Sequence, residues 1–435
     1  MIDLILTPEI NALCNGSDNE LNVLVQARPK EDFKFSKKRK DLNLAVVIDR
    51  SSSMGGQPLE EAKKSAIMLV EKMSQTDRVS IIAYDDYPEI IVPSTLCHNK
   101  RFIIGEISGI RTQGRTDLHG GWLLGAEEVA KYKNNKSINR VLLLSDGNAN
   151  QGVCDTFEIF RQVDKLSETG ISTSTYGLGH HFNEELMIGM ANNGKGQGYY
   201  GETAEDLADP FEEEFELLAN TIATNLKLKV KIPHFVNLKS MNQLNGTYLN
   251  WSIPDLALGG EGWALFKLSV KKEFIKDKPM EVLSCMLEYK NIEGDKHSTE
   301  DHKLILEPLK PSAFSEMESD EKVNSRVLEV TIANYQREAR GAALRGEWHR
   351  VDSIIGYAKD IGNDHEWLRH NIMAIEKYAK KRQTQQFAKE TYYSAEKLDK
   401  RLASYDEVSK DYSMDDEIAK PSFLRRKLER GKRMY

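Results

Sequence analysis

Cysteine is scarce in this sequence, and long apolar runs are missing from it. Its 435 residues include four cysteines and no C-x-x-C pair, so buried free thiols in a reducing compartment are expected rather than disulfides or a zinc site. No apolar stretch approaches the roughly 20 residues that a membrane-spanning helix needs. The N-terminus lacks the basic segment of a signal peptide. These absences predict a cytoplasmic protein with no membrane span.

An excess of positive charge and the common catalytic motifs are also lacking. The chain has 60 Lys and Arg against 67 Asp and Glu, a net charge of -7. This mildly acidic balance argues against a general nucleic-acid surface, so no nucleic-acid partner is expected. The phosphate-binding sequence G-x-x-x-x-G-K-[ST] does not occur, and no serine lies in a nucleophile-elbow sequence.

Residues 41–224 alternate between short apolar runs and stretches with helical spacing. The runs typical of buried strands are residues 42–49, 79–84, 141–146 and 171–177. Helices are predicted from near Leu59, Leu118, Phe157 and Glu184, the last capped by Asn183, and over residues 202–218. This alternation predicts a doubly wound, mostly parallel, Rossmann-like sheet of the α/β class. The glycine-rich residues 194–198 are predicted to form a turn.

After residue 225 the pattern becomes that of an antiparallel sheet. Residues 226–232 alternate strictly between apolar and charged, and further strand candidates are residues 248–253, 262–271, 280–289 and 303–307. Two earlier strands, residues 3–6 and 20–28, have no sheet of their own. We therefore predict that residues 1–40 complete the β-sandwich of residues 225–312, so that the α/β domain of residues 41–224 is inserted into it.

From about residue 315 the chain is helical and highly charged. Four narrow apolar stripes between residues 315 and 405 predict helices that pack as hairpins in a small bundle. Residues 406–435 have the composition of a charged tail. The predicted order is therefore an α/β domain within a β-sandwich, followed by a C-terminal α-helical region.

Hydroxyl and carboxylate side chains follow the strands of the α/β domain. Asp49, Ser51 and Ser53 form an Asp-x-Ser-x-Ser sequence after the first strand, Thr116 lies where a loop meets a helix, and Asp146 ends another strand. Ligands of open α/β sheets bind outside the carboxyl ends of the strands, so we expect these residues to meet there. Oxygen donors of this kind suit a small divalent cation, Mg²⁺ first, with Ca²⁺ or Mn²⁺ as alternatives.

This set of residues resembles the metal-ion-dependent adhesion site of von Willebrand factor A domains. The resemblance implies that the hydroxyls of Ser51, Ser53 and Thr116 ligate the metal directly. It also implies that Asp49 and Asp146 act mainly through water, and that an open position accepts a carboxylate from a partner protein.

Three further segments resemble one subgroup of that family. Residues 78–84, 139–147 and 174–179 are similar to bacterial proteins related to inter-alpha-trypsin-inhibitor heavy chains and to the so-called calcium-activated chloride channel homologues. The resemblance is strong over about residues 41–224 and weak over the flanking sandwich. It implies bacterial relatives that work beside AAA+ ATPases or kinase–phosphatase pairs.

Two groups of residues outside the metal set are candidates for partner contacts. The first is expected at the rim of the metal site and comprises Arg50, Asp117, His180 and His181. For the two histidines, helix capping or solvent exposure is the alternative. The second group is basic, lies in the tail and comprises Arg425, Arg426, Lys427 and Arg430. It would dock an acidic partner surface or a polyanion, and the alternative is a disordered, solubilising end.

These features predict a non-enzymatic scaffold or adaptor that captures an Asp or Glu side chain through bound magnesium, in stress or defence signalling. A cation held by neutral hydroxyls stays electron-poor and attracts a further carboxylate. One alternative is a magnesium-dependent phosphohydrolase using Asp49 and Asp146, with Asp117 or His119 nearby, although two-metal hydrolysis needs more bridging carboxylates. Another is a structural subunit whose metal only stabilises the fold.

Overall fold

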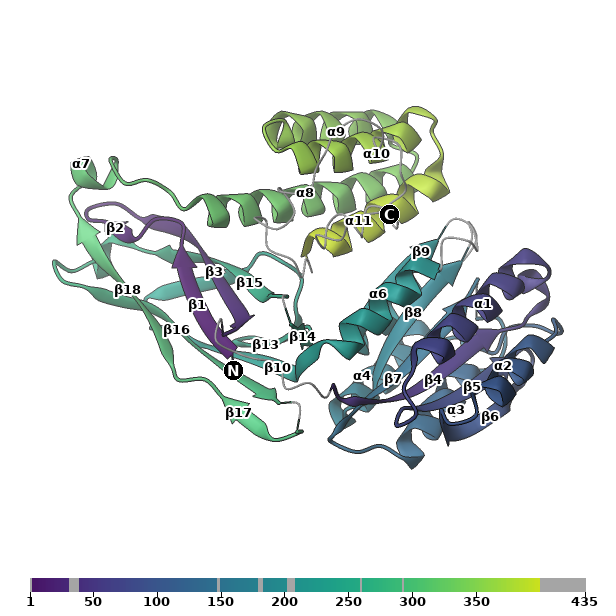
Figure 1. The fold of residues 1–435 in the computed structure, drawn as a ribbon. Coiled ribbons are helices and arrows are strands. Elements are labelled where there is room, and N and C mark those ends of the chain that lie inside the picture. The colour runs from purple at the N-terminus through teal and green to yellow at the C-terminus, as the bar shows by residue number, and fades with distance from the viewer. Residues whose placement is uncertain are drawn as a thin grey trace. The chain divides into compact units, whose positions relative to one another are not determined.

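A computed structural model describes residues 2–30, 39–146, 149–178, 183–201, 208–258, 260–291 and 293–399. The chain divides into two compact units. One unit comprises residues 36–221 and 292–295, and the other, here called the flanking unit, comprises residues 1–35, 222–291 and 296–435. The first is thus inserted into the chain of the second (Figure 1). The predicted histidines of the rim and the basic residues of the tail lie outside the described residues.

The inserted unit is built on a six-stranded sheet with the order β6-β5-β4-β7-β8-β9. Its strands are β4 (Asp41–Asp49), β5 (Arg78–Tyr84), β6 (Pro88–Leu96), β7 (Ser137–Ser145), β8 (Ser172–Leu178) and β9 (Lys195–Gly201). All neighbouring pairs run parallel except β5 and β6, which are antiparallel. The predicted mostly parallel sheet is therefore confirmed.

Helices cover both faces of this sheet (Figure 1). The first face carries α1 (Gln57–Lys72), α2 (Lys100–Gly109) and α6 (Ala208–Ala219), and the second carries α3 (Leu118–Lys131), α4 (Thr156–Thr169) and α5 (Glu184–Asn193). Alternate side chains of β4 point to opposite faces of the sheet. Leu44 and Val46 pack in the core under α1, whereas Val47 lies against Gly125 of α3. The Asn183 side chain caps α5 by accepting from the Leu186 amide, as predicted.

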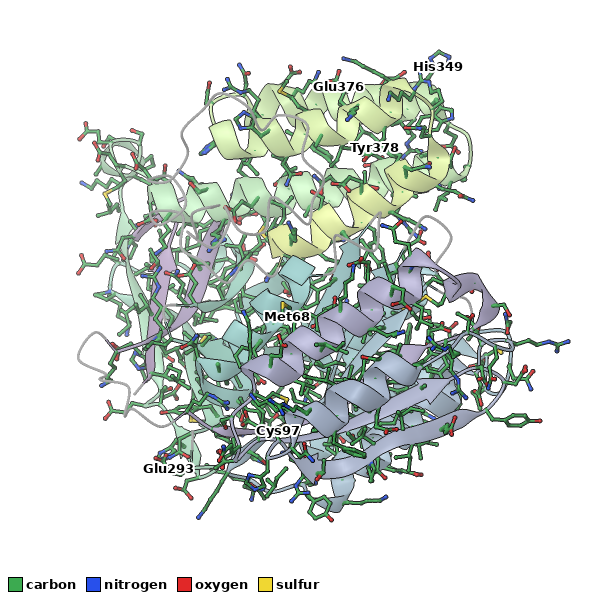
Figure 2. The ribbon with its side chains drawn as sticks, turned by 45° about the vertical axis from the view of Figure 1, so that its right-hand side comes forward. Met68, Cys97, Glu293, His349, Glu376 and Tyr378 are labelled. Atoms are coloured by element: carbon green, nitrogen blue, oxygen red, sulfur yellow. The ribbon has the colours of Figure 1, made fainter. Side chains whose placement is uncertain are left out.

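Cys97 lies in the core beneath α1 and α2. Its side chain is fully buried, and Met68 of α1 packs against the same core (Figure 2). Burial raises the pKa of the Cys97 thiol to about 12. A thiol with so high a pKa stays protonated and unreactive at neutral pH, so Cys97 acts as a small apolar residue.

The glycine-rich residues 194–198 do not form the predicted turn, because residues 195–201 form strand β9. A Cβ atom at Gly196 would lie 2.0 Å from the carbonyl oxygen of Thr173 on β8. Glycine therefore lets β9 approach its neighbour closely, and the pattern reflects crowding between strands. The sequence pattern also failed to predict strand β6, because Pro88 and Pro93 lie within it and proline is uncommon in strands. Proline is tolerated there because β6 is an edge strand.

The flanking unit contains two mainly antiparallel sheets. A four-stranded sheet has the order β1 (Ile2–Pro8), β3 (Asn19–Pro29), β15 (Gly262–Val270) and β11 (Val236–Ser240). The other sheet comprises β12 (Asn245–Thr247), β13 (Asn250–Ile253), β10 (Thr221–Lys231), β16 (Met280–Lys290), β18 (His302–Leu309), β2 (Ala12–Cys14), β14 (Leu256–Ala257) and β17 (Lys296–Ser298). The rings of Trp251 and Phe266, one from each sheet, lie 4.9 Å apart. N-terminal strand β3 pairs with β15, so the α/β unit interrupts a sandwich, as predicted.

A C-terminal helical region follows the sandwich, in agreement with the prediction. After the short α7 (Pro311–Phe314) it comprises α8 (Glu321–Leu344), α9 (Trp348–Gly362), α10 (Glu366–Lys380) and α11 (Thr384–Asp399). Tyr378 of α10 packs against the apolar core of these helices (Figure 2). Val323 of α8 shares a second core with Leu24 and Trp263 of the sandwich. No helix in the described ranges is long and apolar enough to cross a membrane.

Candidate metal centre

Asp49 is the last residue of β4 and is fully buried. One carboxylate oxygen accepts a hydrogen bond from the Ser51 amide at 2.8 Å. The other accepts from the Ser145 hydroxyl at 2.7 Å and from the Tyr84 hydroxyl at 3.3 Å. Because three donors from three segments hold it, the orientation of this carboxylate is set before any ligand binds.

The two serines form a short polar chain that leads from Asp49 to Asp146. The Ser51 and Ser53 hydroxyl oxygens lie 3.1 Å apart, and the Ser53 hydroxyl donates to Asp146 Oδ1 at 3.1 Å. Ser53 lies in the short 3-10 turn η1 (Ser52–Met54), which follows β4, and Asp146 directly follows β7. Since β4 and β7 are neighbouring parallel strands, their carboxyl ends bring Asp49, Ser51, Ser53 and Asp146 together.

Thr116, the fifth predicted ligand, lies on an adjacent loop. It is buried, its amide donates to Asn150 Oδ1 at 3.0 Å, and its carbonyl oxygen accepts from the Asn150 amide at 3.2 Å. The same loop is bound to η1, because the amide and hydroxyl of Ser52 both donate to the Gly114 carbonyl oxygen. The loop that carries Thr116 therefore lies against the serine loop.

The negative charges of Asp49 and Asp146 are not balanced by a positively charged side chain in the described residues. Burial and the neighbouring charge of Asp146 raise the pKa of Asp49 to about 6, and burial also raises the pKa of Asp146. Neither carboxylate forms an ion pair with a residue that the structure describes. No group of three or more His, Cys, Asp or Glu that could hold a metal ion occurs among the described residues, so a metal held here would need hydroxyl oxygens as further ligands. Hard oxygen donors around unneutralised negative charge fit a divalent cation.

Arg50 does not have the exposure that its expected rim position requires. It is 8% exposed, and its guanidinium donates to Asp85 Oδ2 at 2.6 Å and lies 2.9 Å from Glu89 Oε2. A guanidinium engaged by two carboxylates is not available to a partner. We therefore replace the predicted rim role of Arg50 with one in holding the loop after β5.

Asp117 and His119 are also engaged within the domain. Asp117 caps α3, where its Oδ1 accepts from the Gly120 amide at 2.9 Å, and a Cβ at Gly152 would lie 2.3 Å from the same oxygen. His119 is buried, and its Nε2 lies 2.9 Å from Gln162 Oε1. Both side chains thus support the loops around the site.

Sequence reasoning did not select Asp85, although it connects the serine loop after β4 to the loop that carries Thr116. Its side chain accepts from Arg50, and its carbonyl oxygen accepts from the Asp117 amide at 2.8 Å. Burial alone would raise the pKa of Asp85, but hydrogen bonds from the Tyr87 amide, Gln113 and Arg50 hold it below its usual value. Asp85 directly follows β5, so the strand-end rule that selected Asp49 could have found it.

Comparisons with known proteins identify the family of the inserted unit. The model of the von Willebrand factor type A domain family matches residues 43–213. The chain is 27% identical over 258 residues to an uncharacterized protein of Synechocystis, covering 58% of this chain and 60% of that protein. It is 28% identical over 214 residues to the uncharacterized protein YfbK of Escherichia coli (49% and 36% covered). It is 25% identical over 201 residues to human inter-alpha-trypsin inhibitor heavy chain H3 (43% and 22% covered). The match thus spans less than two thirds of each relative.

Solved structures share most of the fold. A von Willebrand factor type A protein from Catenulispora acidiphila has a TM-score of 0.68 at 14% identity, with 86% of this chain and 89% of that chain covered. The ArnB paralog VWA2 from Sulfolobus acidocaldarius has a TM-score of 0.62 at 16% identity, with 91% and 99% covered. At such identities the likeness concerns the fold alone. The family match identifies residues 43–213 as a von Willebrand factor type A domain, so this chain contains a domain of that family.

Proposed function

We propose that this chain is a protein-binding scaffold or adaptor whose A domain captures an acidic side chain of a partner through a bound divalent cation. The residues that would hold the cation are Asp49, Ser51, Ser53, Thr116 and Asp146. The observation that carries the proposal is the polar chain from Ser51 through Ser53 to Asp146, beside the buried carboxylate of Asp49.

The chemistry of this donor set favours binding over catalysis. Neutral hydroxyls leave a divalent cation electron-poor, so a further carboxylate gains a strong contact at an open position. Ser53 is exposed, which leaves the cation accessible from solvent on that side. Magnesium is the preferred cation because it accepts hydroxyls, carboxylates and retained waters.

The finer parts of the proposal rest on the sequence composition, the chemistry of the donor set and the family resemblance. They are a cytoplasmic bacterial protein without enzymatic activity, a role in stress or defence signalling, and a partner from an AAA+ ATPase or kinase–phosphatase system. Because the match spans only part of each relative, these parts remain predictions for the whole protein.

Metal binding is tested by titrating Mg²⁺, Ca²⁺ and Mn²⁺ into EDTA-stripped protein by calorimetry. We expect one Mg²⁺ site, weakened by at least about tenfold in Ser51→Ala and Ser53→Ala, because residues that merely support a ligand already cost about that much. Ser52→Ala is the matched control, since Ser52 is in the same loop and its amide still donates to the Gly114 carbonyl oxygen when its hydroxyl is removed. Equal affinities in all three variants would contradict the site.

Partner capture is tested with tagged protein in Mg²⁺ or EDTA, alongside Asp146→Ala. A partner retained equally in every condition would overturn metal-mediated capture. Sustained hydrolysis of a phosphoester that Asp49→Ala abolishes would support the phosphohydrolase instead. A metal that raises the melting temperature but changes no interaction would support the structural subunit.

A further inference from the structure

The two most exposed large apolar side chains in the described chain both lie near the candidate metal centre. Tyr87 and Phe157 are each 77% exposed. Other large apolar residues on the surface of the inserted unit are better covered: Phe102 is 50% exposed, and Tyr132, at 48%, lies under the Arg78 guanidinium. Single exposed aromatic residues are common, so the position of these two is what matters.

Tyr87 and Phe157 lie on opposite sides of the strand that ends at Asp49. Tyr87 is in the turn between β5 and β6, and Phe157 is the second residue of α4, which follows β7. In the sheet, β4 lies between β5 and β7 (Figure 1). Asn150, in the segment that leads to α4, hydrogen-bonds Thr116. The loops that carry the two aromatic residues therefore border the metal centre.

Both aromatic residues stand on well-held backbone. The Tyr87 amide donates to Asp85 Oδ1 at 3.1 Å. Phe157 is in the first turn of α4, where Asp155 caps the helix by accepting from the Glu158 amide at 2.7 Å. An aromatic side chain on a fixed backbone has only two torsion angles to restrict on binding, and such residues commonly dominate interface energetics.

Arg115 adds positive charge at the same edge. It is exposed and directly precedes the buried Thr116. In the part of the chain that the structure describes, no ion pair or hydrogen bond engages its side chain. An unpaired guanidinium beside a cation site favours an acidic partner segment by charge complementarity, and it accelerates encounter with such a segment.

We propose that Tyr87, Phe157 and Arg115 form a recognition surface around the metal, and that the partner presents an extended acidic segment with apolar residues on both sides of its metal-binding carboxylate. The inference rests on the proposed function and specifies the partner.

Strands are about 4.8 Å apart, so the two aromatic residues are separated by about 10 Å or more. In an extended segment the residues two before and two after the acid share its face and span about 13 Å. The partner motif is therefore apolar-x-Asp/Glu-x-apolar.

The test uses two acetylated, amidated peptides, Leu-Ser-Asp-Ser-Leu and Gly-Ser-Asp-Ser-Gly, titrated into the full chain with saturating Mg²⁺ or with EDTA. We expect both to bind only with Mg²⁺, and the leucine peptide to bind at least about tenfold more tightly, as two leucines lose contact with water. Tyr87→Ser and Phe157→Ser should each reduce that advantage severalfold and leave the glycine peptide unaffected. Arg115→Gln should weaken both peptides.

Phe102→Ser is the matched control, because Phe102 is exposed but follows the far end of β6, away from the metal centre. Mg²⁺ affinity, measured separately, should be the same in all of these variants except Arg115→Gln, where a lost positive charge would raise it slightly. Mg²⁺-dependent binding with no leucine advantage, or with an advantage that the aromatic variants retain, would overturn this inference and leave the proposed function intact. Peptides that bind equally in Mg²⁺ and EDTA, or fail to bind a chain that binds Mg²⁺, would overturn both.

Discussion

The Arg50 guanidinium donates to Asp85 Oδ2 at 2.6 Å, and through Asp85 this ion pair connects the serine loop after β4 to the loop that carries Thr116. Arg50 lies between Asp49 and Ser51 in the chain, and the Asp85 carbonyl oxygen accepts from the Asp117 amide next to Thr116. Both members of the pair are mostly buried. The distance between the ligand loops thus depends on two residues that we do not expect to touch the metal.

Arg50→Gln is expected to lower Mg²⁺ affinity by about 10–100-fold, the usual effect of removing a group that positions metal ligands. Calorimetric titration measures it. Asp85→Asn should have a similar effect, and the double variant should lose less than the sum of the two because they interrupt one interaction. Glu89→Gln is the control: its side chain is 59% exposed, so its loss should change affinity little. Unchanged affinity in Arg50→Gln would exclude the positioning role.

Arg326→Met is expected to destabilise the flanking unit by about 3–5 kcal/mol, because it leaves the carboxylates of Glu261 and Glu329 buried without their shared cation. All three side chains are 2% exposed. Urea unfolding measures the change. Glu338→Gln removes the surface pair with Arg350 and should cost less than about 1 kcal/mol. If both variants lost a similar free energy of unfolding, burial would not be what makes the loss of Arg326 costly.

Gly196→Ala is expected to destabilise the A domain, because its Cβ would lie 2.0 Å from a carbonyl oxygen of β8 and the two strands would have to separate. A cost of about 1–3 kcal/mol is typical of such overpacking, and thermal unfolding measures it. Gly105→Ala in α2 is the control: no atom lies within 4 Å of its Cβ position, so a gain of about 0.5–1 kcal/mol is expected. A neutral Gly196→Ala would refute the close approach of β9.

Because Asp399 is buried, we expect the stability of the flanking unit to depend on pH. Burial raises the pKa of this carboxyl to about 6, although Arg337 opposes the change. An unfolded chain has a pKa of about 3.9 at such a residue. The native state therefore binds the proton more tightly, and this stabilisation is full below about pH 4 and lost as pH rises through about 6.

The measurement is the difference in unfolding free energy between the natural chain and Asp399→Asn from pH 4 to pH 8. The natural chain should lose up to about 3 kcal/mol relative to the variant over that range. Asp352→Asn is the comparison, because Arg382 lowers the pKa of that exposed carboxyl and the trend should not recur. A difference that is constant with pH would contradict the raised pKa.

Much of the fold follows from local patterns in the chain. The apolar run before Asp49 and the one before Asp146 predicted buried strands, because a strand covered on both faces needs apolar residues at almost every position. Both strands are buried along nearly their whole length. Asn183 predicted a helix start because its side chain satisfies a free amide there. Such signals depend on neighbours in sequence, so they can be read without the structure.

Other features depend on contacts between distant segments, and no local pattern contains them. The Arg50 side chain is buried because it pairs with Asp85, a residue that directly follows a different strand. The extended form of the glycine-rich residues 195–201 depends on the backbone of β8, and the pairing of β3 with β15 joins segments separated by the whole α/β unit. Periodicity records which side of an element is buried, whereas the identity of its neighbour is settled by packing and hydrogen bonding across the folded chain. The strand ends could therefore locate the predicted metal ligands, but long-range packing sets the distances between them.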